Sequence, residues 1–392
     1  MTQSRLGSVA PFSVHLEESV FDDLRERLAR TRWPHAPAAP GWSSGTDSNY
    51  LQKLTHYWSD GFDWRAREDY LNSYAQFIAD LGKVRLHYVH HKSGNPAAIP
   101  LLLIHGWPST FAEYLPLLDE LTDLSSSSSG VTFDIVLLSL PGYAFSSRPP
   151  QPVTYATVAE WSHQLMALLG YTSFGVGGDD FGAGVATYMC LQHPRRVLGL
   201  HLSHLEFRPP FGPESAPLSP AERDHLDAMN ARGAGDSGFA AIQQTRPGTL
   251  AVAMSDSPAG MAAWIIDKWH AWSDHRGDLD AHVGRDFLLT TLTLFWATRS
   301  FETSILDYRD NAGTAANPQP SDFVTVPTGV ALFLNYGDRP LPTPPRSWAE
   351  RLYNVTRWTV MTEGGHFAPV ENPRGLSADI RAFFEGLNLP RT

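Results

Sequence analysis

The chain has 392 residues, which suffices for one large core with insertions or for two or three domains. Its net charge of -11 argues against nucleic acid or an anionic membrane surface as the main partner. The single cysteine, Cys190, excludes an internal disulfide framework and fits a reducing compartment. No run approaches about 18 consecutive apolar residues, so we expect a cytoplasmic protein without a membrane span.

Helical patterns fill the beginning of the chain. Leu16, Val20, Leu24 and Leu28 recur at helical spacing, a proline-rich connector follows, and two more helical segments continue to about residue 81. Clear strand signals start only after these segments. We therefore predict an all-helical N-terminal domain over residues 1–82 that packs on the rest of the chain.

Strand and helix patterns then alternate. Apolar or alternating runs typical of strands lie at residues 84–90, 99–104, 133–138, 174–177 and 197–202. Helical patterns separate these runs, and this order predicts an α/β fold with a doubly wound, mostly parallel sheet. Residues 83–204 would form the first part of this core.

The strand rhythm stops between residues 205 and 311, where proline, glycine and aromatic helical patterns dominate. We predict that this segment is a helical cap over the carboxyl edge of the sheet, where open α/β sheets bind ligands. Strand patterns return at 328–333 and 354–360, and a last helix covers about 376–387. Residues 312–392 would complete the core.

Residues 178–182, Gly-Asp-Asp-Phe-Gly, join a short apolar strand to a helical segment. A strand, a tight turn and a helix are the context of a nucleophile elbow, whose middle residue stands over the sheet edge. That residue is Asp180, and a carboxylate there can attack an electrophilic carbon and form an ester. The pattern indicates an epoxide or alkyl halide substrate, although a glycine-rich surface loop would show the same five residues.

Three further features favour catalysis. His366 follows the last strand on a glycine turn, where a neutral imidazole could activate water against an aspartyl ester. The backbone N–H groups of Trp107 and Phe181 could form an oxyanion hole. A carboxylate should orient His366; Asp338 follows the 328–333 strand, and Glu206, after the 197–202 strand, is the alternative.

Several short motifs occur in the order typical of one family. They are Thr-Arg-Trp-Pro at 31–34, Asp-Gly-Phe-Asp-Trp-Arg at 60–65, His-Gly-Trp-Pro at 105–108, Leu-Pro-Gly-Tyr at 140–143, Asp-Phe-Gly-Ala at 180–183, Asp-Ser-Pro-Ala-Gly at 256–260 and Gly-Gly-His-Phe at 364–367. Over nearly its whole length the chain resembles epoxide hydrolases of the microsomal and juvenile-hormone type. The resemblance implies an α/β-hydrolase fold with a helical cap, and conversion of an epoxide to a vicinal diol without a cofactor or a metal.

In that family two cap tyrosines protonate the epoxide oxygen. Tyr308 matches the second, but the first falls on Phe239, which has no proton to give. Tyr308 would then act alone, or Gln243 or a water would assist it, and we expect Phe239, Gln243 and Trp107 to line the substrate pocket. Two other departures are Asp179 in place of the usual second glycine of the elbow and an acid loop about two residues longer than usual.

Two rival functions stay open at this point. A haloalkane dehalogenase also uses an aspartate, a histidine and an acid, and Trp107 could hold its halide. A non-catalytic ligand-binding homologue is the other rival. The aromatic content, with 12 tryptophans and 20 phenylalanines, favours a bulky apolar or aryl epoxide. It does not choose between detoxification and natural-product biosynthesis, and a homodimer is one option for the oligomeric state.

Overall fold

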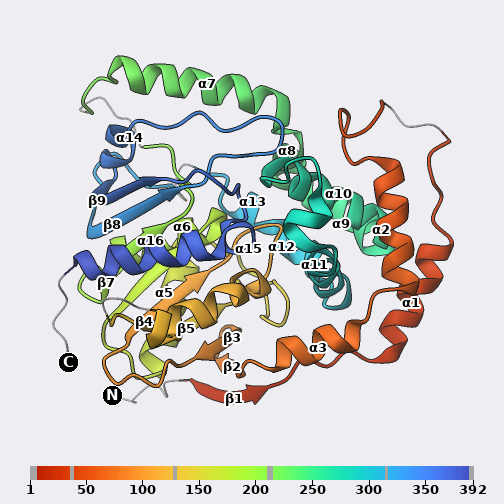
Figure 1. Cartoon of the computed structure of the whole chain (residues 1–392), viewed down its shortest axis with the longest axis horizontal. Coiled ribbons are helices and arrows are strands. Elements are labelled where there is room, and N and C mark those ends of the chain that lie inside the picture. The colour runs from red at the N-terminus through yellow and green to blue at the C-terminus, as the bar shows by residue number, and fades with distance from the viewer. Residues whose placement is uncertain (1–6, 36–38, 127–129, 210–214, 314–316, 388–392) are drawn as a thin grey trace.

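The computed structural model describes residues 7–35, 39–126, 130–209, 215–313 and 317–387 (Figure 1). These residues form a nine-stranded sheet in the order β1-β2-β3-β5-β4-β6-β7-β8-β9. The strands are β1 (Ser8–Phe12), β2 (Gln76–Asp80), β3 (Arg85–His91), β4 (Ile99–Ile104), β5 (Phe133–Leu138), β6 (Phe174–Gly178), β7 (Val197–Leu202), β8 (Val324–Leu332) and β9 (Tyr353–Val360). In this spatial order, each strand from β5 to β9 runs parallel to its neighbour. The pairs β1–β2, β2–β3 and β3–β5 are antiparallel. The predicted doubly wound sheet is confirmed.

The central strands are apolar throughout because helices cover both faces of the sheet. Residues 101–104 of β4 and 135–138 of β5 are all buried. The core helices are η1 (Phe111–Leu117), α4 (Leu118–Thr122), η2 (Leu124–Ser126), α5 (Tyr155–Leu168), α6 (Asp180–Gln192), α14 (Arg346–Glu350), α15 (Ala368–Glu371) and α16 (Pro373–Gly386). This parallel arrangement brings the carboxyl ends of β4, β6, β7, β8 and β9 to one edge.

The first 82 residues are not all-helical, so that prediction is wrong. Helices α1 (Glu18–Ala29), α2 (Ser48–Asp60) and α3 (Trp64–Asn72) are present, but β1 and β2 flank them and extend the sheet edge. Strand β1 is five residues long and almost wholly exposed, so it carries no apolar alternation. Strand β2 begins only four residues after α3, where the sequence pattern predicted that the helix continued.

The N-terminal helices lie beside the cap (Figure 1). The Trp58 indole N–H donates to Thr293 Oγ1 at 2.9 Å, and the Tyr50 hydroxyl donates to Asp280 Oδ1 at 2.6 Å. This segment therefore contacts both the sheet, through the pairing of β1 and β2, and the cap, through hydrogen bonds from α2.

All regular structure in the described residues 215–311 is helical, as predicted for the cap. It comprises α7 (Pro220–Asp236), α8 (Gly238–Thr245), α9 (Pro247–Asp256), α10 (Pro258–Trp272), the π-turn η3 (Asp280–Gly284), α11 (Arg285–Ala297), α12 (Ser300–Ser304) and α13 (Leu306–Asp310). Helix α7 leaves the other cap helices and runs past β8, β9 and α14 (Figure 1). Its Glu222 accepts a hydrogen bond from Arg351 Nε at 2.8 Å. The cap is thus fastened to the core beyond the sheet edge as well.

Candidate active site

Asp180 stands at the first position of α6, directly after β6. Its backbone has φ of +45°, a left-handed conformation that residues other than glycine adopt only at a cost in free energy. Gly178 and Gly182 make the tight turn feasible, because a Cβ at Gly182 would collide with the Ile104 carbonyl and a Cβ at Gly178 with the Gly182 backbone. The elbow predicted from the sequence therefore forms and presents Asp180 at the carboxyl edge.

The two oxygens of the Asp180 carboxyl group have different surroundings. Oδ1 accepts hydrogen bonds from the backbone N–H groups of Trp107 at 2.9 Å and Phe181 at 2.7 Å. Oδ2 lies 3.6 Å from Nε2 of His366. Burial raises the pKa of Asp180 to about 6, and the two N–H donors oppose that rise. The group is therefore mostly a carboxylate at neutral pH, with one oxygen fixed and the other beside the histidine.

A stabilised loop after β9 holds His366. Gly364 has φ of +98°, and the backbone N–H groups of Gly365 and Phe367 donate to the Glu371 carboxylate at 3.0 and 2.9 Å. The backbone N–H of His366 donates to the backbone carbonyl of Trp272 at 2.8 Å. Burial holds the pKa of His366 well below its usual range, and nearby His204 lowers it further, so the imidazole is neutral.

Nδ1 of His366 lies 2.8 Å from the hydroxyl oxygen of Tyr336. Tyr336 follows β8, and this is the position at the sheet edge where a carboxylate was expected. Burial and the charge of Asp180 raise the pKa of Tyr336 well above its usual value, so the phenol keeps its proton. A neutral hydroxyl, rather than a carboxylate, thus orients the imidazole.

A cavity of about 390 Å³ joins these groups. Both the sheet edge and the cap line it. Its lining includes Tyr155, Asp180, Phe181, His204, Glu206, Tyr336 and His366 from the core and Met229, Phe239, Gln244, Trp272 and Tyr308 from the cap. The Asp180 carboxylate and the His366 imidazole thus open into one largely aromatic chamber.

Comparison with known proteins shows which family the chain resembles. Residues 9–114 match the family model described as Epoxide hydrolase N terminus, and residues 99–238 match the model described as alpha/beta hydrolase fold. A relative from Stigmatella aurantiaca is 35% identical over 97% of this chain and 85% of its own length. Epoxide hydrolase 1 of Sus scrofa is 31% identical over 96% of this chain and 88% of its own length. The chain belongs to the epoxide hydrolase family.

Solved structures of epoxide hydrolases share the whole architecture. The juvenile hormone epoxide hydrolase of Bombyx mori superposes with a TM-score of 0.87 at 26% identity, covering 97% of this chain and 95% of that one. The Aspergillus niger epoxide hydrolase gives 0.81 at 29% identity, with 97% of each chain covered. Both cover the N-terminal segment and the cap as well as the core, so the epoxide hydrolase family accounts for the entire fold.

The structure does not bring the predicted acid Asp338 to His366. Gly337, at φ of +46°, turns the chain so that Tyr336 is buried and Asp338 is exposed. Among the described residues, no ion pair joins Asp338 to His366; the charge of Asp338 instead acts on His270 and His275. The sequence pattern located the correct loop, but it could not tell which side chain of the loop faces inward.

The alternative acid, Glu206, lines the cavity without bonding to His366. Its Oε1 accepts a hydrogen bond from the Tyr155 hydroxyl at 2.6 Å, and its Oε2 lies 3.7 Å from Nε2 of His204. Burial and the negative charge of Asp180 raise the pKa of Glu206 to about 8. Glu206 therefore carries a proton at neutral pH.

The predicted pocket residues separate into two groups. Phe239 lines the cavity, whereas the Trp107 ring is buried and stacks on Phe239 with centroids 5.7 Å apart. Gln243 is also buried, and its Oε1 accepts from the Trp264 indole at 2.8 Å; the neighbouring Gln244 lines the cavity instead. The prediction that Gln243 lines the pocket is wrong by one position, because one residue turns about 100° around a helix.

Tyr308 lines the cavity from α13, and its ring lies 5.0 Å from that of Phe181. Burial and Asp180 raise its pKa well above the usual value, so the hydroxyl remains a donor. Residues on both sides of Tyr308 are fixed to the core, since Arg148 pairs with Asp307 and with Asp310 at 2.6 Å each. These three side chains are nearly or fully buried.

Asp179 faces the scaffold rather than the cavity. It is buried and accepts a hydrogen bond from the Tyr114 hydroxyl at 3.0 Å. Burial and the Asp180 charge raise the pKa of Asp179 to about 7. This departure from the family pattern therefore does not add a second carboxylate to the substrate chamber.

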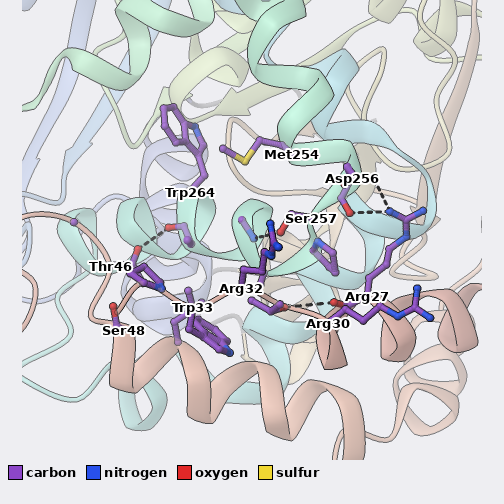
Figure 2. Close-up of a pocket in the computed structure, with 18 of the residues that line it drawn as sticks. Arg27, Arg30, Arg32, Trp33, Thr46, Ser48, Met254, Asp256, Ser257 and Trp264 are labelled. Carbon is purple, nitrogen blue, oxygen red and sulfur yellow. Dashed lines mark hydrogen bonds and ion pairs between the residues drawn. The ribbon is translucent and has the colours of Figure 1, made fainter. Parts of the chain in front are cut away.

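A larger hollow of about 1030 Å³ lies elsewhere, between the N-terminal segment and the cap helices α9 and α10 (Figure 2). Trp33, Trp264 and Ser257 line it, and Arg27 spans one end by donating to Asp256 at 2.8 Å. Its walls do not include Asp180 or His366. This hollow is larger than the cavity that contains Asp180 and His366.

None of the helices in the described part of the chain combines the length and apolar character needed to cross a bilayer.

Proposed function

We propose that the protein hydrolyses an epoxide to a vicinal diol through a covalent ester on Asp180. The observation that carries this proposal is the asymmetry of the Asp180 carboxylate, with Oδ1 bound by two N–H groups and Oδ2 beside Nε2 of His366. Oδ2 attacks a ring carbon, the carbon–oxygen bond breaks, and the Tyr308 hydroxyl donates to the departing oxygen. Oδ1 becomes the carbonyl oxygen of the ester.

His366 then activates water for the second step. Its Nδ1–H donates to the Tyr336 oxygen, which leaves Nε2 free to accept a proton from water. The resulting hydroxide attacks the ester carbonyl, and the negative charge develops on Oδ1. Because Trp107 and Phe181 already bind Oδ1, their N–H groups stabilise that charge without rearrangement. Collapse of this intermediate breaks the bond between the carbonyl carbon and Oδ2, and the departing diol oxygen takes the proton from His366. The oxygen from water completes the restored carboxylate.

The cavity favours an epoxide with an apolar or aryl substituent. Phe181, Phe239, Trp272 and Tyr308 line it. Tyr308 also favours an epoxide over an alkyl halide, because a departing alkoxide needs a proton donor and a departing halide does not. The names of the relatives support the same choice of substrate class.

The test is a single turnover of styrene oxide with excess enzyme in oxygen-18 water. We expect unlabelled diol, because the new oxygen comes from the Asp180 carboxylate and the label enters the protein. Labelled diol would mean that water attacks the epoxide directly. Halide release from a bromoalkane, without diol formation, would instead favour dehalogenation, and tight epoxide binding without turnover would favour a ligand-binding protein.

A further inference from the structure

This chain lacks the first of the two cap tyrosines that the family resemblance implies. Phe239 occupies the first position and lines the cavity with a ring that cannot donate a proton. Gln243 is outside the cavity and binds Trp264. Opening an epoxide produces an alkoxide, and a donor that assists Tyr308 would come from another element of the chamber.

Glu206 is the carboxyl group placed to take this role. It lines the same cavity as Asp180 and Tyr308, but it enters from the loop after β7 rather than from the cap. The Tyr155 hydroxyl binds Oε1 at 2.6 Å and fixes the side chain. Among the described residues, Oε2 has no hydrogen-bond partner, since His204 Nε2 lies 3.7 Å away, which is too long for a hydrogen bond. One oxygen is thus held and the other is available to a ligand.

The surroundings of Glu206 favour the protonated acid. The titratable groups lining the cavity with it are Tyr155 from α5, Asp180 from α6, His204 from its own loop, Tyr308 from α13, Tyr336 after β8 and His366 after β9. The described residues that line this cavity include no lysine or arginine. Asp180 contributes a negative charge, and burial lowers the pKa of His204 to about 4, so that imidazole is neutral as well. A second carboxylate would be unpaired here, and binding a proton removes that cost.

We propose that Glu206 is a catalytic acid that protonates the epoxide oxygen while Asp180 attacks carbon. This inference rests on the proposed function. The Asp180 Oδ2–carbon bond forms, the ring carbon–oxygen bond breaks, and the proton on Glu206 moves to the alkoxide oxygen, giving a hydroxy-ester and a Glu206 carboxylate. Tyr308 donates a hydrogen bond to the same oxygen. In the second step His366 takes one proton from water and gives it to the diol oxygen that leaves the ester. The other proton of water, left on the Asp180 carboxyl group, passes to Glu206 and closes the cycle.

This role differs from that of an acid orienting His366, and the two steps separate the alternatives. A proton donor acts when the ester forms, whereas an orienting acid acts when the ester is hydrolysed. His366→Gln removes the base, so on the proposed function the ester should accumulate and its formation can be followed by intact-protein mass spectrometry. Styrene oxide is the probe.

The decisive comparison is His366→Gln against His366→Gln with Glu206→Gln. We expect the second substitution to slow ester formation by about 100-fold, within the range for general acid catalysis. Glu206→Asp, which retains an acidic proton, should recover part of that loss. Glu350→Gln, a partly exposed glutamate on α14, is the matched control and should leave the rate unchanged.

The pH profile distinguishes proton donation from a structural defect. With Glu206 present, ester formation should rise as Asp180 ionises near pH 6 and fall as Glu206 ionises near pH 8. With Glu206→Gln the fall near pH 8 should disappear. An unchanged rate of ester formation, or a fall near pH 8 that persists in Glu206→Gln, would overturn the inference. Absence of any ester in His366→Gln alone would overturn the aspartyl-ester mechanism itself, and this inference with it.

Discussion

The two walls of the cavity that contains Asp180 and His366 are built differently. On the sheet wall, Asp180 and His366 follow parallel strands. Backbone N–H groups that donate to the Asp180 and Glu371 carboxylates fix the loops that carry them. On the cap wall, Tyr308 lies on a five-residue helix whose place depends on buried ion pairs to Arg148. The sheet wall thus sets geometry through the backbone, and the cap wall sets it through side chains. We expect substitutions on the two walls to fail in different ways.

Asp180→Ala should have the largest effect because it removes the atom that attacks carbon. We expect diol formation to fall by at least about 10⁴-fold, as for other nucleophiles that form covalent intermediates. The measurement is turnover of styrene oxide, with the thermal unfolding midpoint as a check on folding. Retained turnover would remove Asp180 from the mechanism.

Arg148→Met should act on stability instead of on a chemical step. It leaves Asp307 buried without its cation and leaves Asp310 paired only with Arg309, and breaking a buried ion pair in this way costs about 3–5 kcal/mol. Urea denaturation measures this change in the free energy of unfolding. Arg346→Met removes a partly exposed pair with Glu350 and should cost at most about 1 kcal/mol. Equal losses in the two variants would mean that the cap does not depend on Arg148.

Tyr336→Phe should affect only the second chemical step. The imidazole loses the oxygen that accepts its Nδ1–H, so ester hydrolysis should slow by about tenfold, equivalent to about 1.4 kcal/mol. Ester formation should stay within about twofold of the wild-type rate. Rapid-quench mass spectrometry resolves the two rates. If both rates fell together, Tyr336 would be shaping the cavity rather than orienting His366.

Asp338→Asn should have the smallest effect, because the side chain is exposed and does not contact His366. We expect diol formation to stay within about threefold of wild type, as for surface substitutions remote from a site. A 100-fold loss would show that the loop rearranges during turnover and that Asp338 serves as the acid after all.

The sheet wall could be predicted from the sequence because backbone patterns determine it. The bounds predicted for β4, β5 and β7 match the structure, and the elbow forms where the glycines indicated. The choice between Tyr336 and Asp338 could not be predicted, since it depends on the left-handed turn at Gly337. Gln243 and Gln244 are adjacent on α8, and only helix packing decides which one faces the cavity. Strand β1 is exposed and shows no alternation of apolar residues, so the sequence pattern did not predict it.

The N-terminal segment has a mechanical consequence. Its strands β1 and β2 belong to the sheet, and its Tyr50 and Trp58 side chains form hydrogen bonds with the cap. Helix α7 and Arg148 fasten the cap to the core at two other places. Movement of the cap as one rigid body away from the core would therefore break contacts at several of these three attachments. We therefore expect substrate and diol to enter and leave without a rigid-body movement of the cap.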